Sequence, residues 1–97
     1  MTINSGGEMI FAEEVERALA HHRAVYDVVV VGRPSERWGS EVVAVVQLGE
    51  GASASDEELL DEAAQHVASY KLPKAIIRSD HIVRSPPGKA DHRWAKE

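Results

Sequence analysis

The chain has 97 residues, enough for one modest hydrophobic core but too few for a core together with a deep, enclosed substrate pocket. It has no cysteine, which excludes disulfides and thiolate metal sites. No apolar run approaches the roughly 20 residues of a membrane span, and the N-terminus lacks the basic and apolar regions of a signal peptide. We therefore expect a cytoplasmic location and no transmembrane segment.

Charge is distributed unevenly along the chain. The net charge is −5, yet residues 1–70 hold 4 Lys and Arg against 13 Asp and Glu, whereas residues 71–97 hold 7 against 3. A basic C-terminal segment on an acidic body is either a solvated face or a surface that meets an anion such as phosphate or carboxylate. Nucleic acid is disfavoured as that anion because the overall charge is negative and no nucleic-acid-binding motif is present.

The first half of the chain predicts one helix and two strands. Residues 1–10 are expected to form a glycine-containing lead-in. The next stretch, FAEEVERALAHH, places apolar residues at helical spacing from Phe11 onward, with early glutamates that suit a helix N-terminus. VYDVVVVG (25–32) and EVVAVVQL (41–48) are rich in β-branched residues and predict strands, whose turn-rich connection permits an antiparallel pair.

The second half predicts a helix, a strand and a tail. Ser55 followed by Glu58 is a capping-box signature that opens a helix over 56–69, and Pro73 cannot continue that helix. A third strand is expected over 75–83. The helix is expected to bury one apolar face, formed by Leu60, Ala63, Ala64, Val67 and Ala68. The order predicts a small α+β domain with a three-stranded, largely antiparallel sheet covered by two helices, plus an extended basic C-terminal tail.

The tail contains the motif SPPGK, which ends at Lys89. A lysine ammonium suits negative charge that develops on phosphate or carboxylate oxygens. Gly88 lets the backbone approach a ligand closely, and the two preceding prolines restrict the chain. The alternative is a surface turn with an ordinary lysine. A phosphate-binding P-loop is excluded because it needs a glycine six residues before the lysine and Ser or Thr after it.

Two further features allow either a functional or a structural interpretation. Gly6 and Gly7, in SGGE, permit unusual dihedrals or close approach of a ligand, or they form a plain turn. Trp38, in the loop RPSERWGS, is either a stacking platform or a residue that closes the edge of the core. The five histidines show no repeated spacing with carboxylates, so we predict no metal site.

In order, the stretches SGGE, AEEVE, VVVVGRPSERWGSEVVAVV, YKLPK and SPPGK resemble the C-terminal domain of the adenylate-forming, AMP-binding enzymes. The resemblance covers about residues 3–96, and its GxPxxxWG and YKxPK patterns are most similar to those of fatty-acyl-CoA synthetases. It implies that residues 1–97 are the mobile lid of an acyl-CoA synthetase, whose large N-terminal AMP-binding domain is absent from this chain. The isolated chain is therefore expected to be inactive.

The resemblance implies a two-step reaction. ATP and a small-molecule carboxylic acid form an acyl-adenylate and pyrophosphate, and the thiol of coenzyme A then displaces AMP to form a thioester. Lys89 is the implied catalytic residue of the first step, with Gly88 admitting its loop to the cleft. Gly6, Gly7 and Glu8 are implied to line the channel for the pantetheine arm of coenzyme A in the second. Mg²⁺ is expected with ATP, held by ATP and the N-terminal domain.

Two positions depart from the family pattern. The residue after the paired glycines and Glu8 is often Asn or Lys in the family, and here it is Met9. The hinge residue of the family would fall at or before Met1, so we expect it to be absent or replaced. Two other hypotheses stay open: an adenylation domain that loads a carrier protein, and a stand-alone, non-enzymatic binding module with the same fold.

Overall fold

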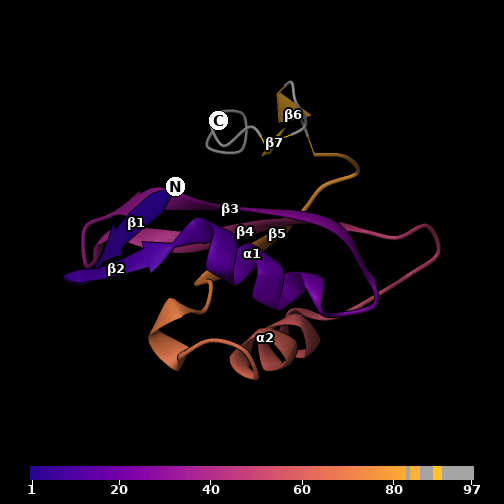
Figure 1. Ribbon diagram of the computed structural model, residues 1–97, viewed down its shortest axis with the longest axis horizontal. Coiled ribbons are helices and arrows are strands. Elements are labelled where there is room, and N and C mark those ends of the chain that lie inside the picture. The colour runs from indigo at the N-terminus through magenta and orange to yellow at the C-terminus, as the bar shows by residue number, and fades with distance from the viewer. Residues whose placement is uncertain (83, 86–88, 91–97) are drawn as a thin grey trace.

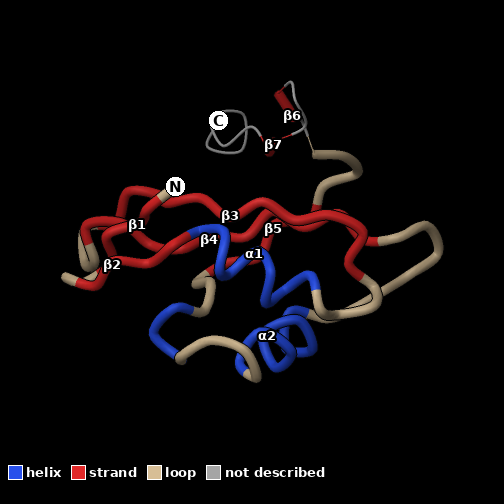
Figure 2. Tube along the Cα trace, in the orientation of Figure 1, coloured by secondary structure: helices blue, strands red, loops and turns tan. Residues whose placement is uncertain are grey.

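The structure is a computed structural model that describes residues 1–82, 84–85 and 89–90. Figure 1 shows the elements in chain order, and Figure 2 shows α1 and α2 together on one side of the strands. The elements are β1 (Thr2–Ser5), β2 (Glu8–Phe11), α1 (Ala12–Ala20), β3 (Val25–Ser35), β4 (Gly39–Leu48), α2 (Asp56–Ala64), the short 3-10 helix η1 (Ser69–Lys71), β5 (Ala75–Arg78), β6 (Arg84–Ser85) and β7 (Lys89–Ala90).

The central unit of the fold is the β3–β4 hairpin. Its antiparallel ladder runs from Val25 opposite Leu48 to Ser35 opposite Gly39, with one irregularity near Asp27. Nearly every ladder position from 28 to 31 and from 42 to 46 is valine, whose branched side chain packs well on a pleated surface. The predicted antiparallel pair is confirmed, and it is longer than expected because much of the turn-rich loop joins the ladder.

The sheet has five strands rather than the three we expected. Along its other edge, β4 pairs with β1 at one end, where Ser5 lies opposite Gly39, and with β5 farther along. The β4–β5 pair is parallel, joined by a crossover through α2, whereas the remaining pairs of this sheet are antiparallel. The additional strands β1 and β2 form a hairpin from the N-terminal segment, which we expected to be a glycine-containing lead-in without strands. The strand β5 ends at Arg78, short of residue 83 where we expected it to end, because a turn made by the Ser79 side chain follows it. The prediction of an α+β domain with two helices on one sheet face is confirmed.

Both faces of the β3–β4 hairpin are buried. The face toward the helices belongs to a cluster that includes Ile3, Ile10, Val15, Leu19, Val28, Val30, Val42, Ala44, Val46, Leu59 and Ala63. The opposite face, here called the valine face, consists of Val29, Val31, Val43 and Val45, each at most 5% exposed. Met1, Ala75 and Ile82 pack against the valine face. Burial on both sides explains why the strands are continuously apolar rather than alternating.

Both helices differ from the prediction at one end. Phe11 precedes α1 in an extended conformation and is 57% exposed, so it lies outside the core. The predicted cap of α2 is confirmed, because the Glu58 N–H donates to Ser55 Oγ at 3.1 Å. However, α2 ends at Ala64 instead of continuing to residue 69. The chain turns there and returns through η1 to the sheet, where the Lys74 N–H donates to Val42 O at 2.7 Å.

The return segment is attached to α1 by an ion pair. Lys71 Nζ lies 2.6 Å from Glu14 Oε1 in a partly buried position. The hydrogen bond to Glu14, with a smaller contribution from its charge, raises the pKa of the Lys71 ammonium above its ordinary value. A raised pKa keeps the Lys71 ammonium charged at every pH below it, so this stabilising charge is lost only as the pH rises through that pKa.

The outer edge of β3 is occupied by side chains. The Val28 N–H donates to Asp27 Oδ1 at 2.9 Å, and the Val30 N–H donates to Glu16 Oε2, which reaches across from α1, at 2.8 Å. Four residues beyond Val30 on the same side, Pro34 has no N–H to offer. Carboxylates and proline on an edge strand prevent it from pairing with another chain.

Replacing Leu59 by alanine tests the observed register of α2. Leu59 is completely buried and Leu60 only partly buried, contrary to the prediction that placed Leu60 on the core face. We expect Leu59→Ala to lower the free energy of unfolding by about 2 to 5 kcal/mol, because it removes methyl groups from a packed core. Urea unfolding of the chain measures this, with Leu60→Ala as the matched control. A larger loss for Leu60→Ala would contradict the register.

Candidate functional site

The paired glycines form the two-residue turn of the β1–β2 hairpin. Ser5 and Glu8 close the hairpin opposite one another, and both glycines have positive φ, 58° at Gly6 and 85° at Gly7. Two successive left-handed residues suit a tight hairpin turn, and glycine adopts this conformation without steric cost. The predicted turn is confirmed, but the sequence analysis missed the strands that flank it because each is only four residues long.

Trp38 packs against this turn. The Gly6 N–H donates to the backbone oxygen of Trp38 at 2.8 Å. A Cβ atom placed on Gly6 would lie 2.9 Å from Trp38 Cε3, closer than two carbons tolerate. Gly6 is therefore required both for its φ and for the closeness of the indole. Trp38 remains 36% exposed, so the indole closes the hairpin and still presents surface to solvent.

Two cations lie over the Trp38 ring. The guanidinium carbon of Arg37 is 4.9 Å from the ring centroid, and Lys74 Nζ is 5.2 Å from it. Buried Pro73 and the hydrogen bond of the Lys74 N–H to β4 fix the backbone from which the lysine side chain extends. Gly6, Arg37, Trp38 and Lys74 are called the tryptophan cluster below. A partly exposed indole beside two positive charges and a glycine turn suits a ligand that combines a ring with phosphate groups.

Sequence reasoning missed the two cations of this cluster. Arg37 and Lys74 are 37 residues apart in sequence order, yet both occur in quoted motifs, RPSERWGS and YKLPK. The presence of both motifs in one chain was the available signal. Nothing in the local spacing of either motif indicates that Lys74 lies over Trp38.

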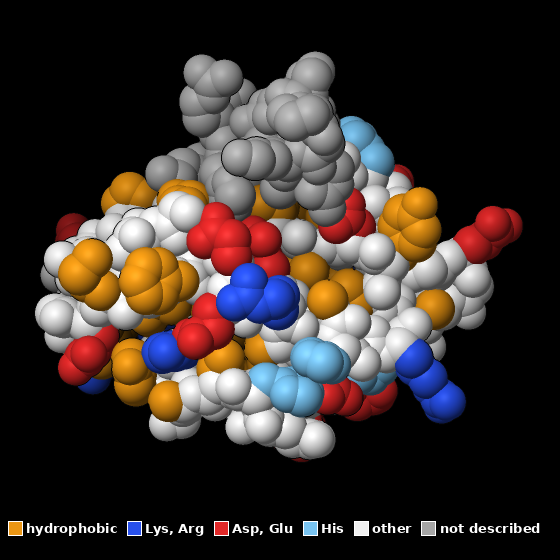
Figure 3. Space-filling view, viewed as in Figure 1, with side chains coloured by type: hydrophobic (Ala, Val, Ile, Leu, Met, Phe, Trp, Pro, Cys, Tyr) orange, Lys and Arg blue, Asp and Glu red, His pale blue; other side chains and the backbone are white. Residues whose placement is uncertain are grey.

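The remaining residues of the turn region are exposed. Glu8 is exposed, and Met9 and Phe11 are 63% and 57% exposed on the same side of β2. Hydrophobic side chains are visible on the molecular surface around the end of the sheet where the β1–β2 hairpin lies (Figure 3). Apolar Met9 gives this edge a different character from the polar residue that the family pattern often has.

Lys89 lies in a second, separate hairpin. The strands β6 and β7 pair antiparallel, with Arg84 opposite Ala90 and Ser85 opposite Lys89. Gly88 lies outside the described residues. Figure 1 shows β6 and β7 beyond the side of the sheet that faces away from α1 and α2, whereas the glycine turn lies at one end of the sheet. The described strands β6 and β7 therefore lie apart from the β1–β2 hairpin (Figure 1).

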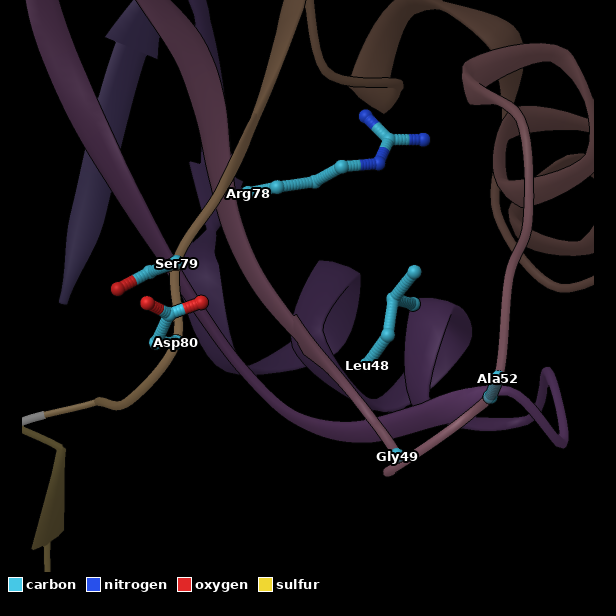
Figure 4. A pocket seen from close by; sticks show the side chains of 6 residues that line it. All are labelled: Leu48, Gly49, Ala52, Arg78, Ser79 and Asp80. Carbon is cyan, nitrogen blue, oxygen red and sulfur yellow. The ribbon is translucent and has the colours of Figure 1, made fainter.

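A shallow hollow of about 320 Å³ lies near the far end of β4. Its lining residues are Leu48, Gly49, Ala52, Arg78, Ser79 and Asp80 (Figure 4). The Arg78 guanidinium is already occupied, because it pairs with Asp56 and donates to the backbone oxygen of Ala54. We therefore assign this hollow no chemistry.

Histidines connect the two helices. The rings of His21 and His66 stack with centroids 4.0 Å apart, and His66 Nε2 lies 3.0 Å from Glu62 Oε2. Across the described residues, no group of three or more His, Asp or Glu side chains is placed to hold a metal ion. Within the same part of the chain, no helix is both long enough and apolar enough to cross a membrane.

The fold, the glycine turn and the Lys89 hairpin together define a small α+β domain that has clear relatives. A family model described as the AMP-binding enzyme C-terminal domain matches residues 14–89. The chain belongs to this family, as the motifs predicted.

Individual relatives agree with the family. The chain is 64% identical over 95 residues to the medium-chain acyl-CoA ligase Mig of Mycobacterium avium. This alignment covers 98% of this chain and 17% of that protein. It is 50% identical over 97 residues to the 3-oxocholest-4-en-26-oate–CoA ligase of Rhodococcus rhodochrous, covering all of this chain and 18% of that protein. A solved fatty acyl-CoA synthetase of Mycobacterium tuberculosis superposes with a TM-score of 0.89 at 32% identity, covering 98% of this chain and 19% of that one. The chain spans less than a fifth of each.

Alanine substitutions at the two glycines separate backbone strain from the Trp38 contact. Both variants place alanine at positive φ, which costs about 1 to 2 kcal/mol. Gly6→Ala also pushes Cβ into the indole, whereas a Cβ on Gly7 meets nothing within 4 Å. We expect Gly6→Ala to lose about 1 kcal/mol or more beyond Gly7→Ala in urea unfolding.

Tryptophan fluorescence gives the second measurement for this pair. With Trp94 replaced by phenylalanine in both variants, only Gly6→Ala should shift the emission of Trp38. Equal stabilities and identical spectra for the two variants would contradict the packing of Trp38 on Gly6.

Proposed function

We propose that this chain is the C-terminal domain of an acyl-CoA ligase. The ligase converts ATP and a carboxylic acid into an acyl-adenylate and then into the coenzyme A thioester. Relatives named as CoA ligases match nearly the whole chain at 64% and 50% identity. The partner of residues 1–97 is the N-terminal AMP-binding domain of the same enzyme. That domain holds most of the ATP site.

The observation that carries the proposal is the tryptophan cluster beside the glycine turn. Coenzyme A combines a thin pantetheine arm with a phosphorylated adenine nucleotide. Gly6 is covered by Trp38, but the turn leaves open backbone at Gly7, beside which a thin arm can pass, and Glu8 borders it. The exposed part of Trp38, with Arg37 and Lys74 over its ring, matches an adenine ring and its phosphates.

We assign the first step to Lys89. A substrate carboxylate must approach a triphosphate that is already anionic, and an ammonium between them offsets the repulsion and stabilises charge that builds in the transition state. Gly88 allows this hairpin close approach to the nucleotide. The domain presents Lys89 and the glycine turn in succession by rotating between the two steps, as a mobile lid does.

The finer assignments follow from the same scheme. Mg²⁺ accompanies ATP and is held by ATP and the N-terminal domain. Medium-chain fatty acids are the first substrates to test, because the Mycobacterium avium relative is named for them. Coenzyme A is favoured over a carrier protein as acceptor, because these relatives are named as CoA ligases. The ligase is assigned to the cytoplasm.

Removing the Lys89 ammonium should separate the two half-reactions. In the full-length ligase that carries this domain, we expect Lys89→Ala to slow acid-dependent pyrophosphate exchange about 100-fold or more. Thioester formation from supplied acyl-adenylate should largely survive, because coenzyme A attacks after Lys89 has withdrawn. Lys96→Ala is the matched control within the same basic segment. Equal losses in both half-reactions would contradict the assigned role, and no loss would make Lys89 an ordinary turn residue.

The tryptophan cluster should affect the opposite half-reaction. We expect Lys74→Ala and Trp38→Ala each to raise the KM for coenzyme A about tenfold. A change of this size corresponds to the free energy of one cation–π or phosphate contact. Pyrophosphate exchange should stay unchanged. Lys71→Ala serves as the control, because Lys71 pairs with Glu14 instead. Unchanged KM values in both variants, or acylation of a carrier protein in place of coenzyme A, would overturn this assignment.

A further inference from the structure

We infer that Ser35 is a positioning residue for coenzyme A binding: its hydroxyl holds the turn that places Arg37 and Trp38 in the tryptophan cluster. This inference rests on the role proposed above for that cluster. It deepens the role by naming a side chain that acts through its neighbours in the loop rather than by touching the ligand.

Ser35 lies at the start of the short connection between β3 and β4. It ends β3 and pairs with Gly39, so three residues, 36–38, separate the two strands. Gly39 has a φ of 81°, a conformation that lets the second strand resume after so tight a turn. Serine is favoured at the first position of such turns because its hydroxyl can bond to the backbone of the turn itself.

The Ser35 hydroxyl makes this bond. The Trp38 N–H donates to Ser35 Oγ at 3.2 Å. On the other side of the residue, the backbone oxygen of Trp38 accepts from the Gly6 N–H at 2.8 Å. Both backbone polar groups of Trp38 are therefore held, one by its own hairpin and the other by the β1–β2 hairpin, which lies at the same end of the sheet (Figure 1).

The turn that Ser35 holds carries two of the side chains proposed to bind coenzyme A. Arg37 directly precedes Trp38, and its guanidinium carbon lies 4.9 Å from the centroid of the indole ring. Lys74 reaches the same ring from a different part of the chain, where the Lys74 N–H donates to β4. Loss of the Ser35 hydroxyl would therefore loosen two members of the cluster and leave the third in place.

The location of the turn makes the hydroxyl more important for position than for folding. Ser35 is partly buried, and residues 36–38 are exposed. Surface connections move more readily than the strands that they join, so a hydrogen bond inside the connection mainly restrains the side chains it carries. An indole that is already held in place binds a ring with less loss of conformational freedom. We expect the hydroxyl to change affinity about three- to tenfold, as one net hydrogen bond does.

The test compares two substitutions of equal shape. Ser35→Thr and Ser35→Val both place a β-branched side chain at the end of β3, but Ser35→Thr alone keeps the hydroxyl. Both are made in the full-length ligase, with Trp38→Ala measured in parallel. Ser40→Val is the control, because it makes the same substitution on the facing strand, opposite Pro34.

We expect Ser35→Val to raise the KM for coenzyme A about three- to tenfold. Ser35→Thr and Ser40→Val should stay within about twofold of wild type, as surface substitutions usually do. Pyrophosphate exchange, and kcat at saturating coenzyme A, should remain within about twofold in every serine variant, which a general loss of folding would not allow.

Tryptophan fluorescence reports the position of the indole directly. In the 97-residue chain with Trp94 replaced by phenylalanine, all tryptophan emission comes from Trp38. Ser35→Val should make this emission more accessible to quenching by acrylamide, whereas Ser35→Thr should leave it unchanged. Equal quenching in the two variants would overturn the inference.

The kinetic outcomes separate an error about Ser35 from an error about the cluster. If Trp38→Ala raises the KM for coenzyme A but Ser35→Val and Ser35→Thr have equal KM values, the hydroxyl does not position the cluster, and the proposed function stands. If Ser35→Val slows both half-reactions equally, Ser35 only stabilises the fold, and the inference is overturned. If Trp38→Ala leaves that KM unchanged, the proposed binding role of the cluster fails, and the role of Ser35 in binding fails with it.

Discussion

The fold depends on a ladder of valines that is buried on both sides. Alternate residues of β3 and β4 point to opposite faces, so one run of side chains packs with α1 and α2 while the next forms the valine face. Both β1 and β5 attach to the same ladder through β4. Apart from the separate β6–β7 hairpin, each strand that carries a candidate functional residue is fixed to this ladder directly or through one neighbour, so displacement of the ladder would displace them together.

The helices and the central strands could be predicted because their signals are local. Periodicity located α1, β-branched runs located β3 and β4, and the Ser55 cap located the start of α2. The ends of elements were predicted less well. Phe11 fits the helical period of α1 but lies outside it, and α2 stops at Ala64, because the chain must turn back to bring Lys74 to β4. That tertiary requirement leaves no trace in the helix sequence itself.

The site shows the same division between local and tertiary information. The turn at Gly6 and Gly7 was predictable, since paired glycines are a local conformational signal. The packing of Trp38 on this turn could not be predicted, because the contact depends on two hairpins that meet where Ser5 pairs with Gly39. The position of Lys74 over the same ring likewise requires a crossover through α2. The resemblance to a family identified the motifs, whereas the structure explains why they must occur together.

Two outer strands of the sheet, β3 and β2, differ in what they offer to other chains. On β3, the amides of Val28 and Val30 are used by Asp27 and Glu16, so this border is closed to a foreign strand. The opposite border, β2, carries the exposed side chains of Met9 and Phe11. When the domain is kept in solution apart from the rest of a ligase, self-association through β2 would hide the neighbourhood of the glycine turn.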